Sequence, residues 1–159
     1  MLHNKVLFVC LGNICRSPMA EGILKHKAKK YGLQLIVDSA GTGHWHAGEN
    51  PDKRAIKTAK ERGIDISKLI ARQITEEDFD NFDFILVADA QVYDGVVDRA
   101  LSREHKLKVD YIMNLSHPEL NMPVPDPYFG GVEGFERVFD MLDNACEALI
   151  KVIHEKSVK

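Results

Sequence analysis

The chain has 159 residues, which is enough for one domain with its own hydrophobic core. An apolar fraction of 45% and a charged fraction of 28% are ordinary for a globular protein and exclude a disordered chain. A net charge of −3 argues against a nucleic-acid-binding protein, which usually carries a basic surplus.

The first apolar run covers only residues 6–9. It is too short for a membrane span or a secretory signal, so we expect a cytoplasmic protein with no membrane insertion. The chain has three cysteines, Cys10, Cys15 and Cys146. An odd number in an intracellular chain does not suggest a disulfide framework, so the chemistry of the free thiols becomes the question.

Strand-like apolar runs alternate with helical patterns along the chain. The expected strands cover residues 5–10, a run starting at 35, 82–88 and 109–113, and the expected helices cover 18–31, 52–62, 90–103 and 133–154. A capping-box pattern at residues 75–78 predicts a short extra helix. This order predicts an α/β fold, in one domain of residues 1–159, with a parallel sheet flanked by helices on both faces. Ligands of such folds bind beyond the carboxyl ends of the strands, where the irregular stretches 41–50 and 116–131 are expected to gather.

The most informative segment is C-L-G-N-I-C-R-S-P at residues 10–18, between the first strand and the first helix. Pro18 suits the first helical position and Ser17 the helix cap. The spacing of Cys10 and Arg16 lets the intervening backbone curl around one anion, which its amides and the helix N-terminus would bind. The residues of this expected anion-binding loop are Leu11, Gly12, Asn13, Ile14 and Cys15.

The loop places the groups needed for phosphoryl transfer side by side. The amides and Arg16 would stabilise Cys10 as a thiolate nucleophile, and Arg16 offers a planar fork for two phosphate oxygens. Ser17 is placed to donate a hydrogen bond to the Cys10 sulfur, which helps the sulfur to act later as a leaving group. The alternative is structural, with Cys10 buried at a strand end and Arg16 on the surface.

These residues, together with Asp126-Pro127-Tyr128 near the other end of the chain, resemble the low-molecular-weight protein tyrosine phosphatases. Segments 38–42 and 71–74 also resemble family segments, so the likeness covers nearly the whole chain. The resemblance implies a three-layer fold with a four-stranded parallel sheet and a covalent cysteinyl-phosphate mechanism without metal or cofactor. The implied partners are phosphotyrosine-containing proteins, with inorganic phosphate as product and inhibitor.

The resemblance also assigns roles outside the loop. A leaving phenolate needs a proton, and Asp126, stiffened by the prolines on either side, matches the general acid of the family. Trp45 and Tyr128 are expected to line the substrate cleft. Ser39, with Asn13, is expected to hold the shape of the loop, and Asp89 to support the loop or cap the following helix.

Three positions bear on substrate choice and on the supporting hydrogen bonds. Ile14 favours phosphotyrosine, because an arginine-phosphatase branch of the family carries threonine there. Leu69 and Val92 depart from the histidine and asparagine found in many members, which puts the hydrogen bonds around the loop in doubt. Cys15 is close enough in sequence to Cys10 to form a reversible disulfide that switches activity off; the alternative is a small residue that fills the loop.

Three other functions have to be weighed against a phosphatase. A zinc site built from Cys10, Cys15, His44 and His46 lacks a second cysteine pair and would place Arg16 beside a cation. An arsenate reductase of the same fold needs further cysteines as a relay, and residues 88–97 contain none. A non-catalytic phosphotyrosine-binding module would normally have lost the cysteine, the arginine or the acid.

Overall fold

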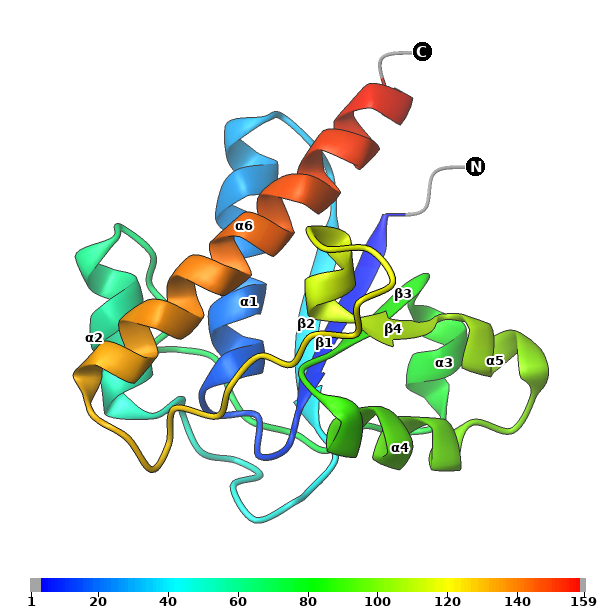
Figure 1. The fold of residues 1–159 in the computed structure, drawn as a ribbon, viewed down its shortest axis with the longest axis horizontal. Coiled ribbons are helices and arrows are strands. Elements are labelled where there is room, and N and C mark those ends of the chain that lie inside the picture. The colour runs from blue at the N-terminus through cyan, green and yellow to red at the C-terminus, as the bar shows by residue number, and fades with distance from the viewer. Residues whose placement is uncertain (1–3, 158–159) are drawn as a thin grey trace.

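The sheet is visible in the computed structural model, which describes residues 4–157. The four strands are β1 (Lys5–Cys10), β2 (Ile36–Gly41), β3 (Phe84–Val87) and β4 (Val109–Tyr111). They lie in the order β2-β1-β3-β4, and every neighbouring pair is parallel (Figure 1). The predicted four-stranded parallel sheet is therefore confirmed.

Helices cover both faces of the sheet (Figure 1). They are α1 (Arg16–Lys30), α2 (Lys53–Glu61), α3 (Glu77–Asn81), α4 (Ala90–Arg99), α5 (Arg103–Leu107) and α6 (Val132–Ser157), with a 3-10 turn, η1 (Ile112–Leu115). Side chains of β1 alternate between two cores, as expected for a central strand. Val6 and Phe8 pack with α1 and α6, whereas Leu7 and Val9 pack with α3 and α4. The predicted three-layer arrangement is confirmed, and in residues 4–157 no helix is long and apolar enough to cross a membrane.

Several boundaries differ from the sequence prediction: β3 covers only Phe84–Val87, and the strand expected over 109–113 ends at Tyr111, where η1 follows. The helix expected over residues 90–103 is two helices, because Ser102 accepts a hydrogen bond from the His105 N–H at 3.1 Å and starts a new helix, α5. The first helix begins at Arg16 with Cys15 at the cap position, so the assignment of Ser17 as the cap was wrong. The Ser17 hydroxyl bonds instead to the side chains around Cys10.

The segments that follow the strands meet at one edge of the sheet. The loop after β1 contacts the end of β2, where the Thr42 N–H donates to the Cys10 carbonyl at 3.0 Å. The Val124 N–H donates to the Ala88 carbonyl at 2.7 Å, which fastens the long stretch 116–131 just beyond β3. The two irregular stretches singled out in the sequence therefore lie beside the segment that joins β1 to α1.

Candidate active site

In the loop of residues 11–15, carbonyl groups accept hydrogen bonds from neighbouring segments, whereas the amides are left free. The Gly43 N–H donates to the Leu11 carbonyl at 2.9 Å, and the Asp52 N–H donates to the Ile14 carbonyl at 2.8 Å. By contrast, no N–H group of residues 11–15 donates a hydrogen bond to any residue between 4 and 157. Free amides beside the N-terminus of α1 are the donors that bind a phosphate group.

The tight curl of this loop sets requirements on two residues. Asn13 has a φ of 58°, a left-handed conformation that asparagine tolerates better than most residues. Gly41, at the end of β2, lies directly against the loop. A Cβ atom there would approach the Leu11 carbonyl oxygen to 2.7 Å, so a side chain would push the loop out of place.

The Cys10 sulfur has the hydrogen-bond partner predicted for it. Cys10 Sγ lies 2.9 Å from Ser17 Oγ, and both residues are buried. The Asn13 amide donates to Ser17 Oγ at 2.7 Å and to Ser39 Oγ at 3.0 Å. The Ser17 hydroxyl can donate to the Cys10 sulfur at 2.9 Å or to the Ala40 carbonyl at 3.5 Å, and the sulfur is the nearer acceptor. Asn13 and Ser39 thus brace the loop from behind, and neither lines the cavity in front of Cys10.

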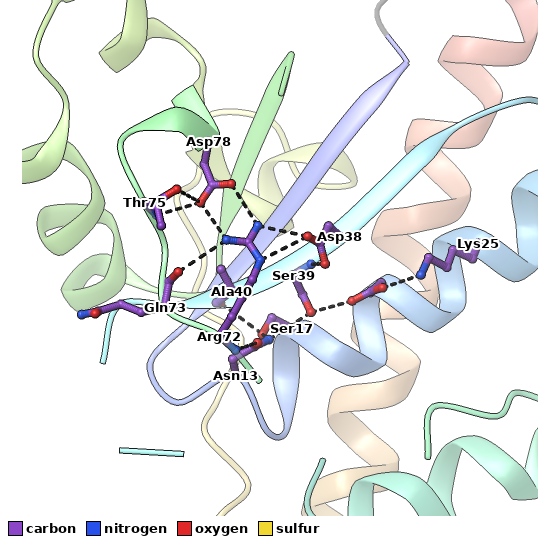
Figure 2. A network of polar contacts seen from close by, with 11 residues as sticks. Asn13, Ser17, Lys25, Asp38, Ser39, Ala40, Arg72, Gln73, Thr75 and Asp78 are labelled. Atoms are coloured by element: carbon purple, nitrogen blue, oxygen red, sulfur yellow. Dashed lines mark hydrogen bonds and ion pairs between the residues drawn. The ribbon is translucent and has the colours of Figure 1, made fainter. Parts of the chain in front are cut away.

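A charged cluster behind the loop was not predicted as a unit. The Arg72 N–H donates to Asn13 Oδ1 at 3.0 Å. The Arg72 guanidinium forms hydrogen bonds of 2.9 to 3.2 Å with the carboxylates of Asp38 and Asp78, and Figure 2 shows it held between them. On the other side, Ser39 donates to the buried Glu21 carboxylate at 2.6 Å. The network therefore connects the loop to β2, α1 and α3.

Leu69 and Val92, which stand where many family members carry histidine and asparagine, make other contacts. Leu69 packs its side chain against the apolar core, and Asn13 Oδ1 is bonded by the Arg72 backbone. Val92 is buried and its N–H donates to Asp89 Oδ1 at 2.9 Å. Neither replacement leaves the loop without support.

Arg16 is buried and is held from one side. Its Nη1 donates to Asp89 Oδ2 at 2.7 Å and to the Val124 carbonyl at 2.8 Å. Burial alone would lower the pKa of Arg16, but the negative charges of Cys10 and Asp89 raise it above its usual value. Nε and Nη2 form no hydrogen bond within the described part of the chain, so they are free for oxygen atoms of a ligand. Asp89 has both expected roles, since it pairs with Arg16 and caps α4.

Asp126 stands opposite Arg16 at the entrance. Its Oδ2 lies 4.0 Å from Arg16 Nη2, and its carboxyl is 39% exposed. Its Oδ1 accepts a hydrogen bond from the Tyr128 N–H at 3.0 Å. A partly exposed carboxyl beside a phosphate site can exchange a proton with a leaving group or with water.

These groups surround a cavity of about 170 Å³. Trp45 and Tyr128 line it as predicted, and Trp45 is 64% exposed, which leaves its ring accessible. Phe129 and His46, which were weaker candidates from the sequence, also line it. The complete lining is Cys10, Leu11, Gly12, Ile14, Cys15, Arg16, Trp45, His46, Asp126, Tyr128 and Phe129.

The other cysteine of the loop is buried beside the nucleophile candidate. Burial, reinforced by the negative charge of Asp52, raises the pKa of Cys15 well above its usual value. The third cysteine, Cys146, lies fully buried on α6. Between residues 4 and 157, no group of three or more His, Cys, Asp or Glu side chains is arranged to hold a metal ion.

Comparisons with known proteins point in one direction. The sequence profile of the family described as "Low molecular weight phosphotyrosine protein phosphatase" matches residues 5–159. A protein of that name from Schizosaccharomyces pombe is 38% identical over 152 residues, which cover 94% of this chain and 96% of the relative.

Solved structures agree with the sequence comparison. A protein tyrosine phosphatase from Entamoeba histolytica is 41% identical and superposes with a TM-score of 0.89, covering 97% of this chain and 99% of the other. A Drosophila arginine phosphatase is 34% identical and superposes with a TM-score of 0.86, covering 92% of this chain and 96% of the other.

Proposed function

The chain belongs to the low molecular weight phosphotyrosine protein phosphatases, and on this premise we propose that Cys10, Arg16 and Asp126 are the catalytic residues of its phosphotyrosine hydrolysis. The observation that carries the proposal is their convergence on one cavity, with the Cys10 thiol behind the free amides and Asp126 at the entrance. Residues from both ends of the chain meet there.

The geometry supports a reaction in two steps. Cys10 Sγ attacks phosphorus, the bond to the phenol oxygen breaks, and Asp126 donates its proton to that oxygen. The free amides and the open side of Arg16 stabilise the charge on the transferring group. Water then attacks phosphorus as Asp126 accepts its proton, the sulfur leaves with the Ser17 hydroxyl beside it, and inorganic phosphate is released.

Substitution of Asp126 by alanine is expected to lower kcat/KM most for the substrates with the poorest leaving groups. p-Nitrophenolate leaves without help, whereas an alkoxide needs a proton, so kcat/KM should fall by about a hundredfold or more for alkyl phosphates and far less for p-nitrophenyl phosphate. Steady-state kinetics on both substrate types checks this. Equal losses on aryl and alkyl phosphates would show that Asp126 is not the acid.

Phosphotyrosine is favoured over phosphoarginine as the substrate. Trp45 and Tyr128 line the cavity that contains Cys10, so we place the ring of a phosphotyrosine against them and its phosphate at Cys10. Ile14 lines the cavity with an apolar side chain, where the arginine-phosphatase branch carries threonine. Proteins that contain phosphotyrosine are therefore the proposed partners, with phosphate as product and competitive inhibitor. A cytoplasmic location and a single domain over residues 1–159 stay predictions.

We also expect a reversible disulfide between Cys10 and Cys15. Peroxide oxidises the Cys10 thiolate to a sulfenic acid, the Cys15 sulfur attacks it with loss of water, and a dithiol later reduces the bond. Wild-type enzyme should therefore regain full activity with dithiothreitol after peroxide treatment, whereas Cys15→Ser should lose activity permanently. Persistent loss in the wild type would count against the disulfide, and Cys146→Ala serves as the matched control.

The raised pKa of Cys15 gives the pH dependence of this switch. Attack requires the Cys15 thiolate, and a raised pKa makes that form scarce at neutral pH. The rate of disulfide closure from the sulfenic acid should therefore rise steadily as the pH is increased.

A further inference from the structure

The side chain of Arg54, on α2, forms hydrogen bonds with the loop that follows Asp126. Arg54 donates from Nη2 to the Tyr128 carbonyl at 2.9 Å and from Nη1 to the Gly130 carbonyl at 3.1 Å. Its guanidinium carbon lies 5.5 Å from the centre of the Tyr128 ring and 4.6 Å from that of Phe135. A planar fork with several donors can serve two carbonyls at once and still stack on a ring. Arg54 therefore contacts both the backbone of this loop and the aromatic side chain of Tyr128.

Arg54 is itself fixed in place by Asp52, which caps α2. Asp52 accepts hydrogen bonds from Arg54 Nε at 3.1 Å and Nη2 at 3.0 Å. Partial burial would raise the pKa of Asp52, but the hydrogen bonds from Arg54 hold it below its usual value. The Asp52 N–H in turn donates to the Ile14 carbonyl of the anion-binding loop. The first turn of α2 thus connects the loop around Cys10 with the loop that carries Asp126.

The loop held by Arg54 is exposed at residues 128–131, which follow the buried Pro127. Phe129 is 91% exposed, and the hydrogen bond from the Gly130 N–H to the Pro127 carbonyl lies within the loop itself. The Asp126 carboxyl depends on this loop because its Oδ1 accepts from the Tyr128 N–H. Arg54 holds the carbonyl of the same residue, so a shift of Tyr128 would change the direction of the Asp126 carboxyl.

We propose that Arg54 is a positioning residue for the general acid. By holding Tyr128 and Gly130, it keeps the Asp126 carboxyl at the entrance, near Arg16 and the oxygen of the leaving group. The inference rests on the proposed role of Asp126, through which Arg54 acts.

The test compares Arg54→Met with the wild type on aryl phosphates of graded leaving-group quality. Methionine keeps apolar contact with the rings but cannot donate to the two carbonyls. We expect kcat/KM to fall by about tenfold for phenyl phosphate and much less for p-nitrophenyl phosphate, because a misplaced acid harms only the leaving groups that need a proton. Arg54→Lys should recover part of the loss.

A matched control lies at the other end of the same helix. Arg62 also stacks on a ring, with its guanidinium carbon 4.4 Å from the centre of Phe139, and pairs with Asp140 at 3.1 Å. Arg62→Met removes an equivalent arginine that does not contact the loop. The dependence of its kcat/KM on the leaving group should therefore match that of the wild type.

The double variant Arg54→Met/Asp126→Ala separates the two hypotheses. If Arg54 acts through Asp126, kcat/KM of the double variant should depend on the leaving group no more strongly than kcat/KM of Asp126→Ala alone. An equal loss on all substrates in Arg54→Met, beside a selective loss in Asp126→Ala, would overturn the role of Arg54 alone. If Asp126→Ala itself showed no selectivity, the assignment of the acid would fail instead.

Discussion

Replacing Cys10 by serine is expected to abolish turnover of p-nitrophenyl phosphate, with a loss of about four orders of magnitude or more. A serine hydroxyl in this position remains protonated, because within residues 4–157 the hydrogen-bond partner of Cys10 Sγ is the Ser17 hydroxyl, which is not a base. The wild type should retain its activity in the presence of a metal chelator. Steady-state assays of both proteins in chelator check the prediction.

Two controls make this result specific. The serine variant should still bind inorganic phosphate by calorimetry, because the amides of residues 11–15 and Arg16 remain. Cys146→Ala should keep wild-type activity, since Cys146 lies in the core away from the cavity. Substantial hydrolysis by Cys10→Ser would mean that another group attacks phosphorus.

Replacing Arg16 by lysine is expected to lower kcat/KM by about a thousandfold although the positive charge is kept. The fork of Arg16 uses Nη1 for Asp89 and Val124, which leaves Nε and Nη2 for two oxygens of the transferring group. Lysine offers one ammonium, which cannot pair with Asp89 and reach two phosphate oxygens in the same geometry. Kinetics and phosphate inhibition measure the effect.

The matched control for Arg16→Lys is Arg62→Lys at the C-cap of α2, which should behave as the wild type. A loss of less than about tenfold in Arg16→Lys would show that charge alone suffices and that the fork is not used.

The sheet and the anion-binding loop could be predicted because local sequence determines them. β1 is a short apolar run that ends at Cys10, and the strand, loop and helix follow within a few residues of each other. Asp89 was expected to support the loop or to cap the following helix, but its pairing with Arg16 was not predicted. The break before α5 was missed because its signal, the cap at Ser102, lies inside a longer helical pattern.

Asn13 and Ser39 were expected to support the loop, but the arginine contacts around the site could not be predicted, because they join distant segments. Arg72 reaches Asn13 across 59 positions, and Arg54 reaches Tyr128 across 74. A single charged residue on a helix normally indicates only a solvated surface. The fold alone brings Arg54 to the carbonyl groups of the loop beside Asp126.

The covalent intermediate is the central claim, and the most direct measurement traps it. Asp126→Ala should form the phosphocysteine readily from p-nitrophenyl phosphate, because that leaving group needs no acid, and should hydrolyse it slowly, because the water lacks its base. Acid quench during turnover, proteolysis and fragment mass spectrometry should place a phosphoryl group on Cys10 and not on Cys15. A phosphoryl group on any other residue, or none on the enzyme while phosphate is still released, would contradict the account.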